Sequence, residues 1–219
     1  RSIAPHVNSK LSDPAVLLID DNANFVISLL SGHFGGANDL TAKIALLLEA
    51  QPVITTSTDV NNKLGIDSIA KRFYCNLENP KNIKFINKAL VNSKKVNLYL
   101  PKSLDYILTD ETYDSYNVIF DESSESIIAE YDNHHVILHP KQIVMGIGAR
   151  RDIASDKVKN AIVQSCNILN IPPSRIDFFA TADVKANEKG ILINVGYYNK
   201  QIKIINMDDI KNFKDESCS

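Results

Sequence analysis

The clearest fold signal in the chain is a stretch near its start, in which residues 25–30 read FVISLL, residues 31–36 read SGHFGG and residues 37–48 read ANDLTAKIALLL. The first segment is a continuous apolar run, a pattern typical of strands that are covered on both faces in α/β proteins. The second segment is a glycine-rich loop. In the third, apolar residues recur at the spacing of an amphipathic helix, namely Leu40, Ile44, Leu47 and Leu48. The stretch therefore predicts a strand, a loop and a helix over about Ala37 to Ala50.

Apolar runs at residues 15–19 and 53–56 flank this stretch and are expected to be further strands. The same order of strand, loop, helix and strand recurs near the end of the chain. There an apolar run at 143–147 precedes a helical stripe over 158–169, which two prolines end, and a strand at 176–180 follows. Because strands alternate with helices at both ends, the sequence predicts an α/β fold with layers of sheet and helix.

The region between these two ends carries a weaker signal. Short helices and strands are expected in it at residues 66–74, 83–91, 96–100 and 118–121, with a hairpin formed by 127–130 and 136–139. We therefore divide the chain into an N-terminal α/β domain over residues 1–59, a less regular middle region over 60–141, and a C-terminal α/β domain over 142–219.

Charge and cysteine content argue against several classes of protein. The 219 residues include 24 Lys and Arg against 26 Asp and Glu, a net charge of −2, which argues against bulk electrostatic attraction to nucleic acid or to an anionic membrane. Cys75, Cys166 and Cys218 lie far apart without Cys-x-x-Cys spacing, so neither a disulfide framework nor a structural zinc site is expected. No apolar run reaches the roughly 20 residues that cross a bilayer. A reducing cytoplasm is the expected location.

The glycine-rich loop is the first candidate site. A helix N-terminus preceded by glycines offers N–H groups and a partial positive charge to a carboxylate or phosphate. The residues assigned to this binding role are Gly32, Gly35, Gly36 and Asn38. His33 in such a loop can act as a general acid or base near neutral pH. The alternative is structural: the glycines form a turn, Asn38 or Asp39 caps the helix, and His33 binds a backbone carbonyl.

A second loop, GIGARR at residues 146–151, places Arg150 and Arg151 side by side at a strand end before a helix. Because guanidinium groups bind carboxylates in a bidentate way, this loop is a candidate for an acidic ligand. The alternative is that the arginines pair with Asp152 or Asp156 on an exposed turn. Neither glycine-bearing loop fits a nucleotide motif, since the first lacks a Lys-Ser/Thr pair and the second lacks the third glycine of a dinucleotide fingerprint.

Two further clusters carry polar side chains. Thr181, Asp183 and Lys185 alternate after an apolar strand, so they share one face if the strand continues and are loop residues with an ion pair if it ends sooner. An Asp–Lys pair at a strand end suits acid–base work or ligand orientation. Three histidines lie in the expected hairpin: His134, His135 and His139. No cysteine or carboxylate converges on them in sequence, so we expect surface histidines and no protein-bound metal.

A set of motifs runs through both ends of the chain. The longest consists of LLSGHFGGANDL at 29–40 and QPVITTSTD at 51–59, preceded by RSIAPH at 1–6 and DPAV at 13–16 and followed by GIGARR at 146–151 and ATADVKA at 180–186. In this order and spacing they resemble the CbiG family of cobalamin-biosynthesis proteins. One departure is Ala149, where the family commonly has a cysteine. The chain begins without a methionine, and by this resemblance we expect it to be the middle part of a longer enzyme, truncated at both ends.

The resemblance implies a hydrolase of the anaerobic route to vitamin B12, cobalt-precorrin-5A hydrolase. In that step the δ-lactone of cobalt-precorrin-5A is opened and a two-carbon bridge leaves as acetaldehyde, which gives cobalt-precorrin-5B. The cobalt belongs to the substrate, so no cofactor of the protein's own is expected. The expected partners are this cobalt corrinoid and other enzymes of the pathway, whereas nucleic acid and membranes are not expected.

Roles for the candidate residues follow from that implied reaction. His33 activates the water that attacks the lactone carbonyl, and N–H groups of Gly35 and Gly36 stabilise the oxyanion. The remaining candidates are assigned as follows: Arg150, Arg151 and Thr181 bind the substrate, and Asp183 and Lys185 handle the proton when the carbon bridge leaves. The alternative from another class is a non-catalytic protein that holds corrinoid intermediates for partner enzymes, because the sequence contains no unmistakable pair of nucleophile and base.

Overall fold

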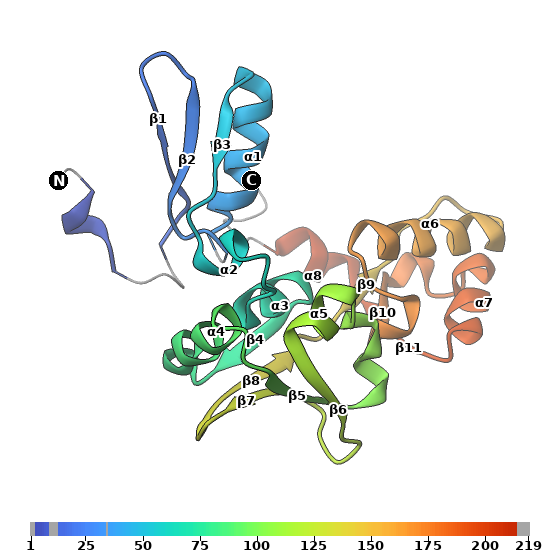
Figure 1. The fold of residues 1–219 in the computed structure, drawn as a ribbon. Helices are drawn as coiled ribbons and strands as arrows, with labels where there is room; N and C mark the ends of the chain where they lie inside the picture. Colours follow the sequence, from blue (N-terminus) through green and yellow to red (C-terminus); the bar gives the residue numbers. More distant parts are fainter. Residues whose placement is uncertain (1–2, 9–12, 34, 214–219) are drawn as a thin grey trace. The chain divides into compact units, whose positions relative to one another are not determined.

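A computed structural model describes residues 3–8, 13–33 and 35–213 (Figure 1). Phe34 of the glycine-rich loop and Cys218 lie outside the described residues. The chain forms two compact units, and the boundary between them falls between Lys141 and Gln142. Each is considered separately below, as the first unit and the second unit. In the described part of the chain, no helix combines the length and the apolar character needed to cross a membrane.

The first unit begins with a small sheet in the strand order β1-β2-β3. Its elements are the 3₁₀ turn η1 (Ala4–His6), β1 (Val16–Ile19), β2 (Phe25–Leu30), α1 (Ala37–Leu48) and β3 (Gln51–Val53). The strands β1 and β2 pair antiparallel, whereas β2 and β3 pair parallel and are connected by α1, as a parallel pair requires a crossover. The predicted order of strand, loop, helix and strand is therefore confirmed, although β3 ends at Val53, where the predicted strand begins.

The expectation that these strands are covered on both faces is wrong. In β2, Val26 and Ser28 are buried, while Phe25 and Leu29 on the alternate positions are each 47% exposed. In β1, Leu18 is 52% exposed. The helix α1 contacts this sheet (Figure 1), so in the described residues one face is packed and the other is open. A continuous apolar run shows that both faces of a strand are apolar, but it does not show which element, if any, packs against each face.

The middle of the chain forms the larger sheet of the first unit, in the order β4-β8-β7-β5-β6. Its strands are β4 (Cys75–Glu78), β5 (Val96–Leu100), β6 (Tyr116–Phe120), β7 (Ile127–Tyr131) and β8 (His134–Pro140). Its helices are α2 (Ser57–Val60), α3 (Ile66–Arg72), α4 (Ile83–Val91) and α5 (Asp110–Ser115), with the 3₁₀ segments η2 (Pro80–Asn82) and η3 (Lys102–Ile107). The predicted helices, strands and hairpin of this region are all present.

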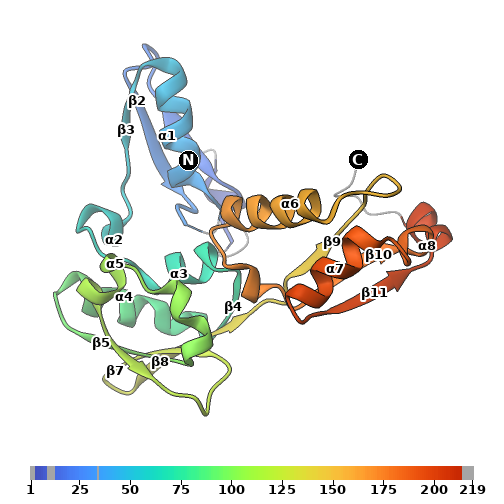
Figure 2. The ribbon, with the colours of Figure 1, turned by 90° about the vertical axis from the view of Figure 1, so that its right-hand side faces the viewer.

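This region is more regular than the sequence signal indicated. Residues of β5 alternate between buried and partly exposed positions, with Val96, Leu98 and Leu100 fully buried. They belong to a hydrophobic core that also contains Ile69 of α3 and Ile86 of α4. Figures 1 and 2 show α3 and α4 beside this sheet. Because buried residues alternate with partly exposed ones along β5, this strand gives a weaker signal than a continuous apolar run, although the sheet as a whole buries a substantial core.

The second unit has a parallel sheet in the order β11-β10-β9. Its elements are β9 (Val144–Gly146), α6 (Ser155–Ile168), the turn η4 (Pro173–Arg175), β10 (Phe178–Ala182), η5 (Asp183–Lys185), α7 (Lys189–Tyr197), β11 (Gln201–Ile205) and α8 (Met207–Asn212). The helices α6 and α7 pack against each other and connect the parallel strands (Figure 2). Ile162, Phe179 and Ile191 are buried in its core. The predicted α/β character of the chain is confirmed in both units.

Candidate active site around His33

A cavity of about 920 Å³ lies in the first unit, next to the end of β2. Residues 28–33 and 55–58 line one part of it, and Asp67, η2 and one side of α4 line the rest. Ligand pockets usually measure about 300–1,000 Å³, so this cavity is suited to a large ligand. The first part of the glycine-rich loop, with Gly32 and His33, therefore borders this cavity, whereas Gly35, Gly36 and Asn38 do not line it.

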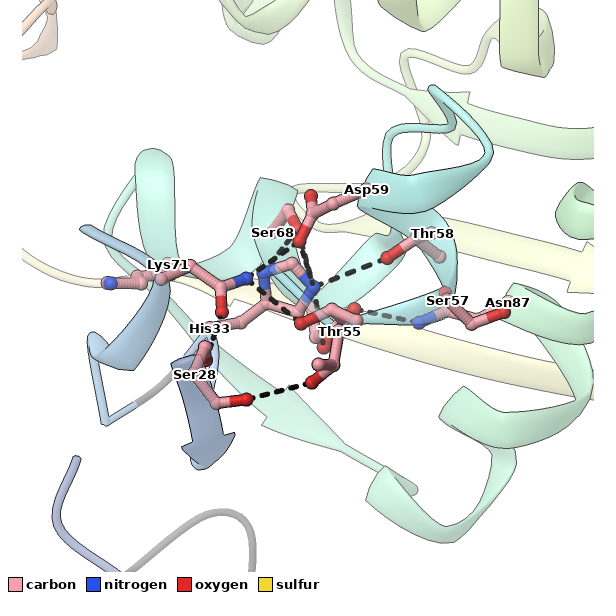
Figure 3. Close-up of polar contacts among 12 residues, drawn as sticks. Ser28, His33, Thr55, Ser57, Thr58, Asp59, Ser68, Lys71 and Asn87 are labelled. Carbon is pink, nitrogen blue, oxygen red and sulfur yellow. Dashed lines mark hydrogen bonds and ion pairs between the residues drawn. The ribbon is translucent and has the colours of Figure 1, made fainter. Parts of the chain in front are cut away.

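His33 is held in the wall of this cavity by side chains from two neighbouring helices (Figure 3). Its Nδ1 lies 3.1 Å from the Ser68 hydroxyl, and its Nε2 lies 3.3 Å from the Thr58 hydroxyl. Two carboxylates are nearby: Nε2 is 3.7 Å from Asp59 Oδ2 and 3.9 Å from Asp67 Oδ2. The His33 side chain is 13% exposed. An imidazole in this position can accept a proton, because the two carboxylates stabilise the positive charge that forms on the ring.

Hydrogen bonds between backbone N–H groups at the start of α1 and carbonyls of the preceding loop fix the conformation of that loop. The backbone N–H groups of Gly36, Ala37 and Asn38 donate to the carbonyls of His33, Ser31 and Gly32 respectively, each at 3.1 Å. Gly36 is the residue before the helix and has a φ of 79°, a left-handed conformation that suits glycine. The prediction that this helix start offers free N–H groups to an anion is therefore wrong for Gly36, because the loop folds back over the helix end.

Asn38 connects the glycine-rich loop to the segment after β3. Its carbonyl oxygen accepts a hydrogen bond from the Ser28 hydroxyl at 2.6 Å. Its Nδ2 donates to Thr56 Oγ1 at 2.9 Å and to Asp59 Oδ2 at 2.7 Å. The alternative in which Asn38 caps the helix is wrong, since it lies inside α1 and makes no capping bond. Asn38 instead fixes Asp59, one of the two carboxylates beside His33.

The second carboxylate, Asp67, is fixed from the opposite side by α4. Asn87 Nδ2 donates to Asp67 Oδ1 at 2.8 Å, and Asn87 Oδ1 accepts from the Ile66 backbone N–H at 3.1 Å. The Asp67 side chain is only 15% exposed. Its charge is also felt by Tyr116, because burial first and the Asp67 carboxylate second raise the pKa of the Tyr116 phenol well above its usual value.

Most of the residues that surround His33 were not predicted as site residues from the sequence. They are Thr58, Asp59, Asp67, Ser68 and Asn87. Asp67 and Ser68 lie in the first turn of α3, directly after Gly65. Two polar residues in the first turn of a helix that follows a glycine were the available signal, but nothing local connects that helix to the loop of His33.

The arginine-bearing loop belongs to the second unit. Arg150 and Arg151 are exposed between β9 and α6. Within the described residues, neither forms the ion pair with Asp152 or Asp156 that the structural alternative required. Their side chains are accessible to an acidic ligand, and their predicted role in binding stays a prediction.

The cluster after β10 follows the alternative in which the strand ends early. The strand ends at Ala182, and Asp183 and Lys185 lie in η5. Thr181 is buried, and its hydroxyl donates to the Ile147 carbonyl at 2.7 Å. The ion pair differs from the expected one, because Lys185 lies 3.7 Å from Glu188. Asp183 instead accepts the backbone N–H of Val184 at 2.6 Å.

The histidines of the hairpin have other neighbours. His139 lies 2.7 Å from Glu78 through Nε2 and 3.0 Å from the Ser126 hydroxyl through Nδ1; His139 and Glu78 are exposed, and Ser126 is half-buried. His134 stacks on Phe85 with ring centres 3.9 Å apart. Among the described residues there is no group of three or more His, Cys, Asp or Glu side chains arranged to hold a metal ion.

Known proteins match the chain at both ends and along most of its length. Residues 1–59 match the family model for the N-terminal domain of cobalamin synthesis G, and residues 143–219 match the model for its C-terminus. A protein of Methanocaldococcus jannaschii, named "Probable cobalt-precorrin-5A hydrolase", is 32% identical over 203 residues, which cover 93% of this chain and 60% of the relative. The cobalt-precorrin-5A hydrolase of Salmonella typhimurium is 32% identical over 205 residues, with 88% and 58% covered.

One solved structure is also similar. It is a protein from Sulfolobus solfataricus described as a cobalamin biosynthesis protein G homolog, with a TM-score of 0.61 and 27% identity. The match covers 98% of this chain and 63% of that one. The chain thus spans about 60% of the length of the relatives that it matches. Since the two family models together match more than half of its residues, the chain belongs to the cobalamin synthesis G (CbiG) family.

Proposed function

We propose that the protein is a hydrolase that opens the lactone of cobalt-precorrin-5A and releases the two-carbon bridge as acetaldehyde. The names of its relatives support this proposal. The observation that carries it is the position of His33, which lies in the wall of a large cavity with two carboxylates and two hydroxyls around its ring. A corrinoid is a large disc with acetate and propionate side chains, so it requires a cavity of this size.

His33 serves as the general base in the first step. It removes a proton from water while the water oxygen bonds to the lactone carbonyl carbon. The C–O bond of the lactone ring then breaks, and the leaving oxygen takes the proton back from His33. The products of this step are a hydroxyl group on the two-carbon bridge and a carboxylic acid, which ionises to a carboxylate by releasing its proton to the solvent. Asp59 and Asp67 stabilise the protonated ring between the two transfers.

The second step breaks a carbon–carbon bond. When the new hydroxyl loses its proton, its electron pair forms the C=O bond of acetaldehyde, and the bond between the bridge and the macrocycle breaks. The electrons of that bond remain on the conjugated macrocycle. We keep Asp183 and Lys185 as the groups proposed for this proton, and Arg150, Arg151 and Thr181 as proposed contacts of the substrate. Their support is the family motif in which they lie.

The cobalt is part of the substrate in this proposal, and no cofactor of the protein's own takes part. A cytoplasmic location is also part of it. It is supported by Cys166, a buried free thiol of α6, because thiols persist in a reducing compartment.

Replacing His33 tests the proposed base. We expect His33→Ala to lower the rate of acetaldehyde release from cobalt-precorrin-5A about 10²–10⁴-fold, the usual contribution of a general base. His135→Ala is the matched control, because that side chain is exposed and does not line the cavity. The assay requires anaerobic substrate and a circular dichroism check that both variants are folded.

Two results would contradict the proposal. An undiminished rate in folded His33→Ala would remove His33 from the mechanism. Tight binding of the corrinoid to the unaltered protein without any acetaldehyde would favour the alternative of a protein that holds corrinoid intermediates for partner enzymes.

A further inference from the structure

One wall of the His33 cavity carries a row of lysines, Lys81, Lys84 and Lys88, which we call the lysine row. Lys81 lies in η2, which runs directly into α4, and the other two lie in α4. Offsets of three and four residues place side chains on the same face of a helix. The opposite face of α4 is buried in the core of the first unit through Ile86, Ala89 and Leu90. The packing of α4 therefore directs the lysine row away from the core.

The lysine row is a local concentration of positive charge. All three side chains are exposed, and none of them forms an ion pair within the described residues. Lys84 lies over the ring of Phe85, 4.8 Å from its centre, a cation–π contact that stabilises the ammonium group without neutralising its charge. The chain as a whole has a net charge of −2. Uncompensated ammonium groups in one cavity wall attract an anionic ligand over a range set by the ionic strength.

The face of α4 that carries the lysine row also carries a residue that positions a neighbour of His33. Asn87, which lies next to Lys88 in the sequence, also lines the cavity and donates to Asp67. Asp67 in turn lies 3.9 Å from His33 Nε2. A ligand held by the lysine row is therefore held by the helix that also positions one of the two carboxylates beside the histidine.

We propose that the lysine row binds the peripheral carboxylates of the corrinoid and so holds the substrate in the cavity of His33. This inference rests on the proposed function, which supplies the substrate. Lys88 lies seven positions after Lys81, about 10 Å along a helix, so the row can contact more than one carboxylate along one edge of a disc. Lysine is suited to this task because its long stem lets the charge reach carboxylates in different positions.

The test replaces all three lysines by glutamine. The matched control is the triple glutamine variant of Lys43, Lys94 and Lys102, three exposed lysines that do not line the cavity, so both variants have the same net charge. Binding is followed by visible absorbance with a cobalt corrinoid whose carboxylates are free, and with the same corrinoid after esterification. Turnover is followed with cobalt-precorrin-5A.

We expect the row variant to raise both Kd for the free-acid corrinoid and KM about tenfold while kcat changes little. Its affinity should also depend less on salt than that of the control variant. The esterified corrinoid should bind equally to both. Replacement of the three lysines by arginine, which keeps the charge, should restore binding.

The outcomes separate this inference from the proposed function. If the row variant binds and turns over like the control, the lysine row has no part in binding and the inference is overturned. If the unaltered protein releases no acetaldehyde but the row variant still binds the free-acid corrinoid tenfold more weakly, the proposed hydrolysis fails and the binding role of the row stands.

Discussion

The loop before α1 and the loop before α6 follow the same order of strand, loop and helix, yet they differ in how they are held. In the first, backbone N–H groups close onto the loop carbonyls, and Asn38 ties the helix to the segment after β3. In the second, Gly148 has open space around it and the two arginines are exposed. A glycine-rich strand end therefore does not by itself define a site. The first loop differs because two neighbouring helices bring Thr58, Asp67 and Ser68 to its histidine.

Of the substitutions that compare the two loops, we expect one at Asn38 to change the free energy of unfolding most. Asn38→Asp replaces the Nδ2 donor by an acceptor that lies 2.7 Å from Asp59 Oδ2, so a hydrogen bond becomes a repulsion between like charges. We expect the variant to lower the free energy of unfolding by about 2–4 kcal/mol. In the second unit, Arg150→Gln should change it by less than about 0.5 kcal/mol. Denaturant unfolding followed by circular dichroism measures both.

A double variant controls for this interpretation. In Asn38→Asp combined with Asp59→Asn, the amide and the carboxylate exchange places and can bond again. The double variant should recover most of the lost stability, and two independent, additive losses would show that the contact between these side chains is not the cause.

A smaller effect is expected from adding one methyl group to each loop. At Gly32 a Cβ atom would lie 2.7 Å from both Asn38 Oδ1 and Thr56 Oγ1, whereas at Gly148 it would meet nothing within 4 Å. Gly32→Ala should therefore cost about 1–3 kcal/mol of unfolding free energy, and Gly148→Ala should be neutral or slightly stabilising. Equal stability of the two variants in thermal unfolding would show that the first loop is no more tightly packed than the second.

The smallest effect on stability is expected from a substitution in the turn between β1 and β2, and this effect depends on pH. The Asp20 carboxylate accepts the Phe25 backbone N–H at 2.6 Å, and this hydrogen bond lowers the pKa of Asp20. A group with a lowered pKa stabilises the fold above its unfolded pKa, and this contribution is lost as pH falls through the folded pKa. Asp20→Asn should therefore be less stable than the unaltered protein at pH 7, and the difference should shrink on acidification below about pH 4. A difference that is constant from pH 7 to pH 3 would contradict the assignment.

Local patterns in the sequence were sufficient for much of the fold. The stripe of Leu40, Ile44 and Leu48 predicted the existence of α1, because helical periodicity is a local property. The same holds for His33, whose place in a loop beside glycines marked it as a candidate. The stripe did not predict the buried face of α1, which consists of Ala37, Thr41 and Ala45, while Leu40 and Leu48 are exposed. The exposure of Phe25 could not be predicted in this way, since burial depends on which element packs against each face of a strand.

The rest of the site depends on contacts between distant parts of the chain. Ser68 and Asp67 reach His33 only because α3 packs beside the glycine-rich loop, and no spacing in the sequence encodes that contact. The prediction that the N–H group of Gly36 is free to bind an anion was wrong for a related reason. A helix start lacks partners within the helix, but the loop before it can supply them.

His33 lies far along the chain from the residues of α3 and α4 that complete its site, and this separation affects the order of folding. A nascent chain that ends at Val60 contains His33 and Thr58 but lacks Ser68 on α3 and Asn87 on α4. Contacts of this range require loop closure before they stabilise anything, so they form late. The imidazole therefore acquires Ser68 and Asp67 as neighbours only after α3 has been synthesised and packed, and Asp67 gains its hydrogen bond from Asn87 only when α4 follows.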